Sequence, residues 1–465
     1  MKKEYYINEK NSLINKNKTN IGNNVSKIQL KKENNTIKIR NKNKKILKAY
    51  FKEQQTIKKR IYLYIILFII ILFPILFFVY KIYSKKRIEI INKIELDKLS
   101  FNLTIEKEMD EEINEAQNYM NLILKGIKID KDEKYYPSKN PKISIVISVY
   151  NGEAFLNTAL LSIQNQDLKD IEIVMVDDGS KDNSVNLIKE LMKTEPRIVL
   201  YENKENKGPF YTKAKGVLLS KGKYILVMDE DDMYVQRDAF RCLYVESERN
   251  NLDILGFYTR HSGASIGRYR NTFGEKKKIM YQPEVSNLMF YYDSKGSIKR
   301  FGGLLSNILV KANLFKKVIK LVDEKNLNTF MFCHEDFILF FLLSRYAYNA
   351  KYIDRVFYIF LHTWNPNDPK IVLRNQYKVD DIKNKQCLSY INFFEIIFKN
   401  TNNTTKDKKI AFSQLETYYL YNHCRVNKDT RDKAIEVFKL YLNCEYISKK
   451  DKDKIQKFID EGNKI

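Results

Sequence analysis

The sequence predicts an α/β protein: a mainly parallel β-sheet flanked by helices, with one N-terminal transmembrane helix and a helical C-terminal extension. Between residues 141 and 260, short β-branched runs alternate with helix-patterned segments, which is typical of a parallel sheet covered on both faces. The stretch 61–80 contains no charged residue and is long enough to cross a bilayer. The 465 residues suffice for one large domain with appendages.

Charge and cysteine content exclude several classes of protein. The chain has 82 Lys and Arg against 57 Asp and Glu, a net charge of +25, and 44% of its residues are hydrophobic. A wholly disordered chain is excluded by that hydrophobic content. The five cysteines are scattered and form no Cys-x-x-Cys pair, which excludes a disulfide-dense scaffold and argues against a zinc ribbon.

Residues 1–60 are predicted to be a disordered basic tail. They hold 18 Lys and Arg, 4 Asp and Glu and eleven Asn, without a sustained apolar period. We interpret the segment as a solvated extension, with contact to nucleic acid or anionic lipid as the alternative. Nucleic acid is not expected as a partner, because the basic excess lacks interleaved aromatic or groove-reading motifs.

Residues 61–80 are predicted to be a single membrane-crossing helix that acts as a signal anchor. Basic residues flank it on both sides, at 58–60 and at 81–87. The apolar run is too long, and too deep in the chain, for a cleaved signal peptide. We expect a cytosolic N-terminus and a luminal catalytic domain in an endomembrane compartment (ER or Golgi), although the flanking charges leave the orientation open.

Residues 81–140 are predicted to form a helical stem. Met109, Ile113, Met120 and Leu124 fall on one face of a helix whose other positions are mainly charged. That face is expected to pack on the following domain; packing on a second copy, which would give a homo-oligomer, is the alternative.

The next segments alternate between strand and helix patterns. Strands are predicted at 143–149, 171–176, 198–201 and 224–228, and helices at 153–165, 183–193 and 210–220. Parallel strands end at one edge of a sheet, where such folds bind ligands. The side chains expected at that edge are Tyr150, Asp177, Asp178, Asp229, Asp231 and Asp232.

The acidic residues at this edge indicate a cation site. Asp229, Asp231 and Asp232 place carboxylates close together, and Mg²⁺ or Mn²⁺ would relieve their repulsion. A solvated loop is the alternative for this cluster. For Asp177 and Asp178 the alternative is a turn with a helix cap, and Tyr150 either stacks on a base or packs inside the sheet.

The segments that carry these residues read PKISIVISVYNGEAFLNTALLSIQNQ, then DIEIVMVDDGSKDNS, then NKGPFYTKAKGVLLSKGKYILVMDEDD. Together they resemble a family 2 glycosyltransferase with the GT-A fold. The resemblance implies sugar transfer from a nucleotide-diphosphate sugar, taken here as a UDP-sugar, with inversion and a divalent cation. The acceptor would be a hydroxyl on a glycan, glycoprotein or glycolipid. The Gln-x-x-Arg-Trp signature of processive members is missing.

The resemblance also implies roles for individual residues. Lys213 departs from the family's usual Ala-Arg-Asn but keeps a cation that could face the diphosphate. A histidine near the metal or diphosphate is frequent in relatives, and a structural histidine is the alternative for His362. The implied nucleotide-sugar-binding residues are Ser148, Tyr150, Asp177, Asp178, Lys213 and Asp231, and the implied metal ligands are Asp229, Asp231, Asp232 and His362.

Inversion requires a carboxylate that accepts the proton of the acceptor hydroxyl. Relatives carry an acidic pair at the start of a helix at this distance from the metal motif, which makes Asp336 the expected general base and Glu335 its orienting or acceptor-binding neighbour. Capping of the helix by Asp336 is the alternative.

The resulting organisation is a tail (1–60), a membrane helix (61–80), a stem (81–140), a GT-A domain (141–370) and a helical extension (371–465). Two other functions stay open from the sequence. One is a polyprenyl-phosphate sugar synthase on the cytosolic face, and the other is an inactive nucleotide-sugar-binding homologue.

Overall fold

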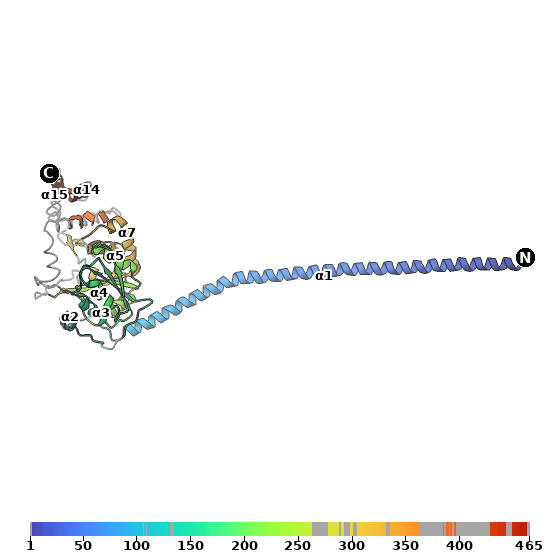
Figure 1. The fold of residues 1–465 in the computed structure, drawn as a ribbon, viewed down its shortest axis with the longest axis horizontal. Coiled ribbons are helices and arrows are strands. Elements are labelled where there is room, and N and C mark those ends of the chain that lie inside the picture. Colours follow the sequence, from blue (N-terminus) through green and yellow to red (C-terminus); the bar gives the residue numbers. More distant parts are fainter. Residues whose placement is uncertain are drawn as a thin grey trace. The chain divides into compact units, whose positions relative to one another are not determined.

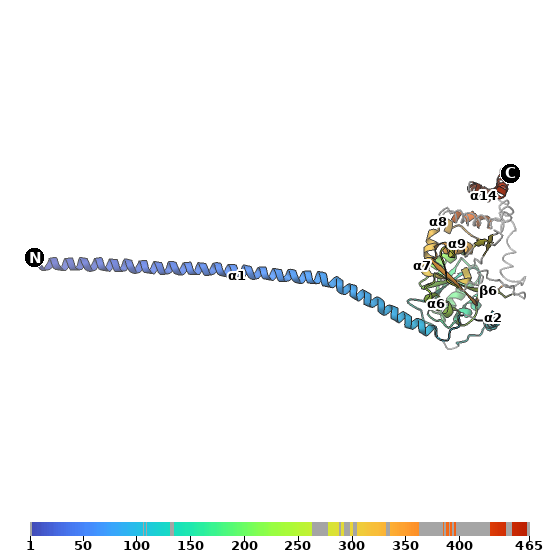
Figure 2. The same ribbon diagram turned by 180° about the vertical axis from the view of Figure 1, so that it is seen from behind.

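The computed structural model describes most of the chain in two compact units, residues 1–93 and 94–465 (Figures 1 and 2). The described residues are 2–105, 107, 109–130, 134–262, 278–287, 290–292, 298–300, 305–331, 335–361, 428–442, 449–462 and a few positions between 385 and 396.

Helix α1 (Lys2–Leu99) is continuous in Figure 1; its residues up to Lys93 make up the first unit, and its last turn belongs to the second. Its part Lys44–Leu99 contains an 18-residue window of mean hydropathy 3.0, none of which is buried, so by length and composition this helix is able to cross a bilayer. The sequence predicts a disordered tail over residues 1–60, whereas the structure has residues 2–60 in helix α1. The segment contains no Pro and a single Gly, so nothing in it interrupts helical hydrogen bonding.

The second unit is built on one nine-stranded sheet with the strand order β3-β2-β1-β4-β10-β6-β11-β5, and β7 also pairs with β11. Strands β3, β2, β1 and β4 are mutually parallel, whereas β10 runs antiparallel between β4 and β6. The sheet is therefore mixed, with the predicted parallel order in its first half. The strands are β1 (Ile143–Val149), β2 (Ile171–Asp177), β3 (Ile198–Glu202), β4 (Tyr224–Asp229), β5 (Met233–Tyr234), β6 (Ile254–His261), β7 (Met280–Tyr281), β10 (Ile308–Lys311) and β11 (Asn349–Phe360); β8 (Phe290–Tyr292) and β9 (Ile298–Arg300) form a separate pair.

Helices cover both faces of this sheet, as predicted. Alternate residues of one strand point to opposite faces, so Val146 lies in one core, with residues of α5, α7 and α9, and Ile145 lies in the other, with residues of α3 and α6. The helices are α2 (Met109–Leu124), α3 (Leu156–Gln164), α4 (Ser184–Leu191), α5 (Pro209–Leu219), α6 (Ala239–Arg249), α7 (Ala312–Leu321), α8 (Glu324–Leu327), α9 (Glu335–Tyr346), α14 (Lys428–Leu442) and α15 (Lys449–Gly462), with short 3₁₀ turns η1 (Val285–Asn287) and η2 (Leu305–Asn307).

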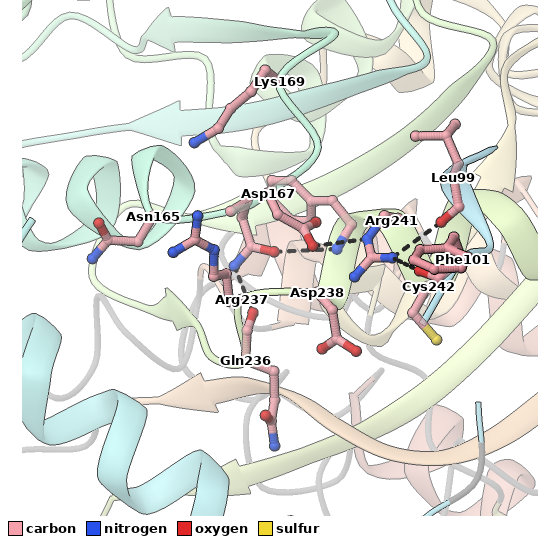
Figure 3. A network of polar contacts seen from close by, with 12 residues as sticks. Leu99, Phe101, Asn165, Asp167, Lys169, Gln236, Arg237, Asp238, Arg241 and Cys242 are labelled. Carbon is pink, nitrogen blue, oxygen red and sulfur yellow. Dashed lines mark hydrogen bonds and ion pairs between the residues drawn. The ribbon is translucent and has the colours of Figure 1, made fainter. Parts of the chain in front are cut away.

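The chain joins the sheet through the end of α1. Figure 3 shows Arg241 of α6, which donates to the carbonyl oxygens of Leu99 and Phe101, both at 3.1 Å, and pairs through Nε with Asp167 at 2.8 Å. The backbone N–H of Asp167 donates to the carbonyl of Arg237 at 2.9 Å. Asp167 lies between α3 and β2, so this network sits at the edge where the parallel strands begin.

Helix α2 packs on the domain, which was the favoured expectation for the stem, but it uses a different face. Met120 is buried as predicted, whereas Leu124 is 53% exposed. The face that packs against β5 and β11 includes Ala116, Tyr119 and Ile123.

The reason for the different face is a buried polar residue, Glu112. The side chains of Glu112 and Arg355 in β11 are both 0% exposed, and Arg355 Nε lies 2.9 Å from either carboxylate oxygen of Glu112. Arg355 also pairs with Asp238 at 3.0 Å. Burial raises the pKa of Glu112, and the charge of Arg355 opposes that rise. This ion pair fixes the rotation of α2 about its axis.

Removing Arg355 should therefore destabilise the domain strongly. We expect Arg355→Met to lower the free energy of unfolding by about 3–5 kcal/mol, because Glu112 would be left as an uncompensated buried charge. Chemical denaturation followed by circular dichroism measures this. The exposed pair of Lys193 with Glu190 is the control, and Lys193→Ala should cost less than about 0.5 kcal/mol. Equal losses of unfolding free energy in the two variants would contradict the view that the buried pair of Arg355 with Glu112 stabilises the domain.

Candidate active site

Three parallel strands end side by side and bring the predicted polar residues to one edge. In the sheet register, Val149 pairs with Asp177 and Ser148 pairs with Asp229. Because β1 lies between β2 and β4, Asp177 and Asp229 are two strand spacings apart, about 10 Å. Ser148 is 8% exposed and Tyr150 is half-buried at the end of β1.

Asp177 closes the turn that follows β2. Its Oδ2 accepts hydrogen bonds from the N–H groups of Gly179, at 3.0 Å, and Ser180, at 3.2 Å. Gly179 has a φ of 73°, which glycine adopts without steric cost. The Oδ1 atom of Asp177 is buried and has no partner among the described residues. The turn interpretation therefore accounts for one carboxylate oxygen, and the other stays buried without a hydrogen-bond partner among the described residues.

Asp178 organises the loop before α5. Its carboxylate accepts from the N–H groups of Lys207 and Gly208, both at 2.8 Å, and from Asn203 Nδ2 at 2.9 Å. Gly208 has a φ of 86°, and a Cβ there would meet the carbonyl oxygen of Met331 at 3.0 Å. Both oxygens of Asp178 are thus engaged by the protein, and the residue shapes the site through this loop.

The turns after β1 and β2 are bonded to each other. Ser180 Oγ accepts from the N–H of Asn151 at 3.0 Å, and Asn151 Oδ1 accepts from the N–H of Lys181 at 2.8 Å. Asn151 has a φ of 54°, a conformation that Asn tolerates better than most residues. These bonds hold Tyr150 beside the turn that carries Asp177.

The acidic loop after β4 is held by a residue that the sequence did not single out, Tyr358 in β11. Its hydroxyl donates to Asp232 Oδ2 at 2.8 Å and accepts from the N–H of Asp229 at 3.1 Å. The N–H of Leu361 donates to Asp232 Oδ1 at 3.1 Å. Burial, together with the charges of Asp232 and Asp229, raises the pKa of Tyr358, so its hydroxyl stays protonated. In the sequence, the one feature that pointed to this role of Tyr358 was a hydroxyl group within an otherwise apolar strand.

The chemistry of the acidic loop suits a hard divalent cation, because its donors are all carboxylate oxygens. Within the described part of the chain, no three His, Cys, Asp or Glu side chains are arranged as a complete metal site. Asp229 is 34% exposed on its side chain, and Asp232 is turned toward Tyr358. The other expected ligand, His362, lies outside the described residues.

Lys213 joins the acidic loop to the start of α9. Its Nζ lies 3.1 Å from Asp229 Oδ1, 3.0 Å from Glu335 Oε1 and 3.1 Å from Asp336 Oδ1. Burial alone would lower the pKa of Lys213, but the charges of Asp229, Asp336 and Glu335 raise it well above its ordinary value. The lysine is therefore a fixed cation.

Asp336 and Glu335 lie in the first turn of α9, with side chains 16% and 13% exposed. Besides Lys213, the N–H of Leu305 donates to Asp336, at 3.4 Å. Burial raises the pKa of Asp336 to about 7; Lys213 opposes this rise, whereas the charges of Glu335 and Asp229 add to it. A carboxyl group with this pKa exchanges a proton near neutral pH.

The role of Tyr358 can be tested against its neighbour. We expect Tyr358→Phe to lower the free energy of unfolding by about 1.5–3 kcal/mol, because Asp232 and the N–H of Asp229 lose a partner. Tyr234 is the matched control: its ring lies 5.1 Å away and its buried hydroxyl has no partner among the described residues. Tyr234→Phe should be neutral or stabilising in denaturant titrations. A larger loss for Tyr234→Phe would refute the assignment.

Comparison with known proteins agrees with the geometry. Residues 144–302 match the family model "Glycosyl transferase family 2". The uncharacterized glycosyltransferase EpsJ of Bacillus subtilis is 30% identical over 229 residues, which are 49% of this chain and 62% of the relative. Glycosyltransferase GlyA of Streptococcus pneumoniae is 30% identical over 216 residues, 45% of this chain and 31% of the relative. The chain thus spans less than two thirds of the length of either relative.

A crystal structure of S. aureus TarS 1-349 with UDP-GlcNAc covers 70% of this chain and 92% of that one, with a TM-score of 0.47 and 15% identity. The curated relatives named above are bacterial and give no support to the expected ER or Golgi location. The family match covers β1 to β4 and the acidic loop, and it ends before Glu335, Asp336 and Tyr358, which complete the candidate site. The similarity to glycosyltransferase family 2 is thus shown for residues 144–302.

Proposed function

We propose that this protein is an inverting glycosyltransferase that moves a sugar from a nucleotide-diphosphate sugar, most simply a UDP-sugar, to an acceptor hydroxyl. One observation carries the proposal: Lys213 gathers Asp229 from the end of β4 with Glu335 and Asp336 from the start of α9, at 3.0–3.1 Å. A carboxylate with a near-neutral pKa then stands beside the acidic loop at the ligand-binding edge of the sheet.

The donor would lie along the ends of β1, β2 and β4. Ser148, Tyr150 and Asp231 line its nucleotide and ribose part, and Asp178 shapes this part through its loop. The unpaired Oδ1 of Asp177 suits a base imide N–H or a ribose hydroxyl. Asp229, Asp231 and Asp232 would hold Mn²⁺ or Mg²⁺, with His362 as a further ligand, and the cation would supply positive charge for the departing diphosphate.

The transfer itself is a single displacement. The acceptor oxygen forms a bond to the anomeric carbon while the bond from that carbon to the diphosphate oxygen breaks, and the hydroxyl proton passes to Asp336. Glu335 orients the acceptor. The 16% exposure of the Asp336 side chain leaves room for a hydroxyl to reach it.

A carbohydrate-type acceptor is supported by two further relatives. One is a Campylobacter jejuni GalNAc(5)-diNAcBac-PP-undecaprenol beta-1,3-glucosyltransferase, 37% identical over 93 residues. The other is a Bacillus spizizenii poly(ribitol-phosphate) beta-glucosyltransferase, 38% identical over 116 residues. We therefore favour a glycan or polyol polymer, free or lipid-linked, as acceptor. The apolar part of α1 would keep the enzyme at a membrane.

The proposal is tested by a donor screen and one variant. With Mn²⁺ and a panel of nucleotide sugars, the full chain in detergent should release nucleoside diphosphate in an acceptor-dependent way. Asp336→Asn should lower kcat by about 10²–10⁴-fold while calorimetry shows unchanged donor affinity, because only proton transfer is lost. The exposed acid Glu190 is the control, and Glu190→Gln should leave kcat unchanged. Full activity of Asp336→Asn would contradict the base assignment.

The reaction should also lose rate in mild acid. Asp336 acts as a base only in its charged form, and its pKa is raised to about 7, so kcat/KM should fall as the pH drops through about 7. The measurement is kcat/KM for the acceptor between pH 5 and 9 at constant ionic strength. An acid limb near pH 4, the ordinary range of a carboxyl group, would contradict the buried-base interpretation.

A further inference from the structure

We infer that Lys213 is a positioning residue that holds the base Asp336 in place and that it does not bind the donor diphosphate. The inference rests on the proposed function and assigns Lys213 a different role from the one that the family resemblance implies. Its consequence is that a divalent cation held at the acidic loop, and not this lysine, would balance the charge of the diphosphate.

The first argument is the number of hydrogen-bond donors. A lysine ammonium has three N–H donors and no acceptor. Three carboxylate oxygens, from Asp229, Glu335 and Asp336, lie within 3.1 Å of Lys213 Nζ. Two of the donors form hydrogen bonds to Glu335 and Asp336, and the third faces Asp229 in an ion pair. A phosphate oxygen would have to compete with these carboxylates for the ammonium.

The second argument is accessibility. The Lys213 side chain is 4% exposed, less than the 34% of Asp229 and the 16% of Asp336. A ligand at the sheet edge reaches the carboxylates before it reaches the ammonium. Lys213 thus lies behind the acids and supports them.

The third argument is the rigidity of the helix that carries Lys213. Its neighbours Thr212 and Ala214 are both fully buried in α5, and Gly216 lies so close to β1 that a Cβ would meet Val146 at 2.4 Å. Helix α5 also packs against α9. The ammonium is thereby fixed relative to the sheet, and through it so is the first turn of α9.

The test separates positioning from diphosphate binding. In Lys213→Met we expect kcat at saturating donor to fall at least 100-fold, with the Kd of UDP and Mn²⁺, measured by calorimetry, within twofold of the wild type. Lys213→Arg, which keeps the charge, should recover part of kcat. The exposed Lys189, which pairs with Glu202, is the control, and Lys189→Met should change neither quantity. A tenfold weaker Kd for UDP with kcat retained would overturn the inference.

A second readout does not depend on turnover. Hydrogen exchange of the full chain, followed by mass spectrometry, should be faster over residues 335–343 in Lys213→Met than in the wild type, and close to wild type in Lys213→Arg. Unchanged exchange there overturns the inference. If Lys213→Met does not fold, Lys213→Arg alone decides, with a lower kcat and an unchanged UDP Kd expected. If the wild-type chain is inactive with every donor, the proposed function is refuted. The hydrogen-exchange comparison does not need activity, so it still tests whether Lys213 holds the start of α9.

Discussion

The candidate site depends on one buried cation, Lys213, surrounded by three carboxylates. Burying an ion costs several kcal/mol unless partners compensate it, and Asp229, Glu335 and Asp336 provide that compensation. The reverse also holds, because without the ammonium the acids would repel one another. Since Asp336 in α9 lies 123 positions from Lys213 in the chain, this mutual attraction is what joins α9 to the sheet edge in a single site.

The same principle recurs in the rest of the edge. Asp178 is satisfied by backbone N–H groups of the 203–208 loop, and Asp232 by Tyr358 and the N–H of Leu361. Each acid therefore has a fixed orientation before any ligand binds, which spares the cost of ordering it later. Asp177 is the exception, because one of its oxygens is left without a protein partner among the described residues.

Local sequence patterns were enough to predict the strands of the sheet, but they did not predict polar pairs between residues far apart in the chain. Strand β1 begins and ends at the predicted residues because a β-branched run is bounded by turn formers. The motif residues likewise share the predicted edge. The prediction of which face of α2 packs on the domain was wrong, because Glu112 is buried against Arg355. These two residues are 243 positions apart in the chain, and a local hydrophobic period does not reveal such a pair. The partners of Lys213 and the role of Tyr358 were hidden for the same reason.

The contacts of the stem also define where an independently folding piece of this chain must begin. A shortened version cut at the start of the family match would leave Arg355 facing solvent with half of its carboxylate partners gone, and Arg241 without the carbonyls of Leu99 and Phe101. A soluble version for crystallisation should therefore start close to Ile94, the first residue of the second compact unit. The part of the stem from Ile94 onward is in this sense part of the second compact unit and not a spacer.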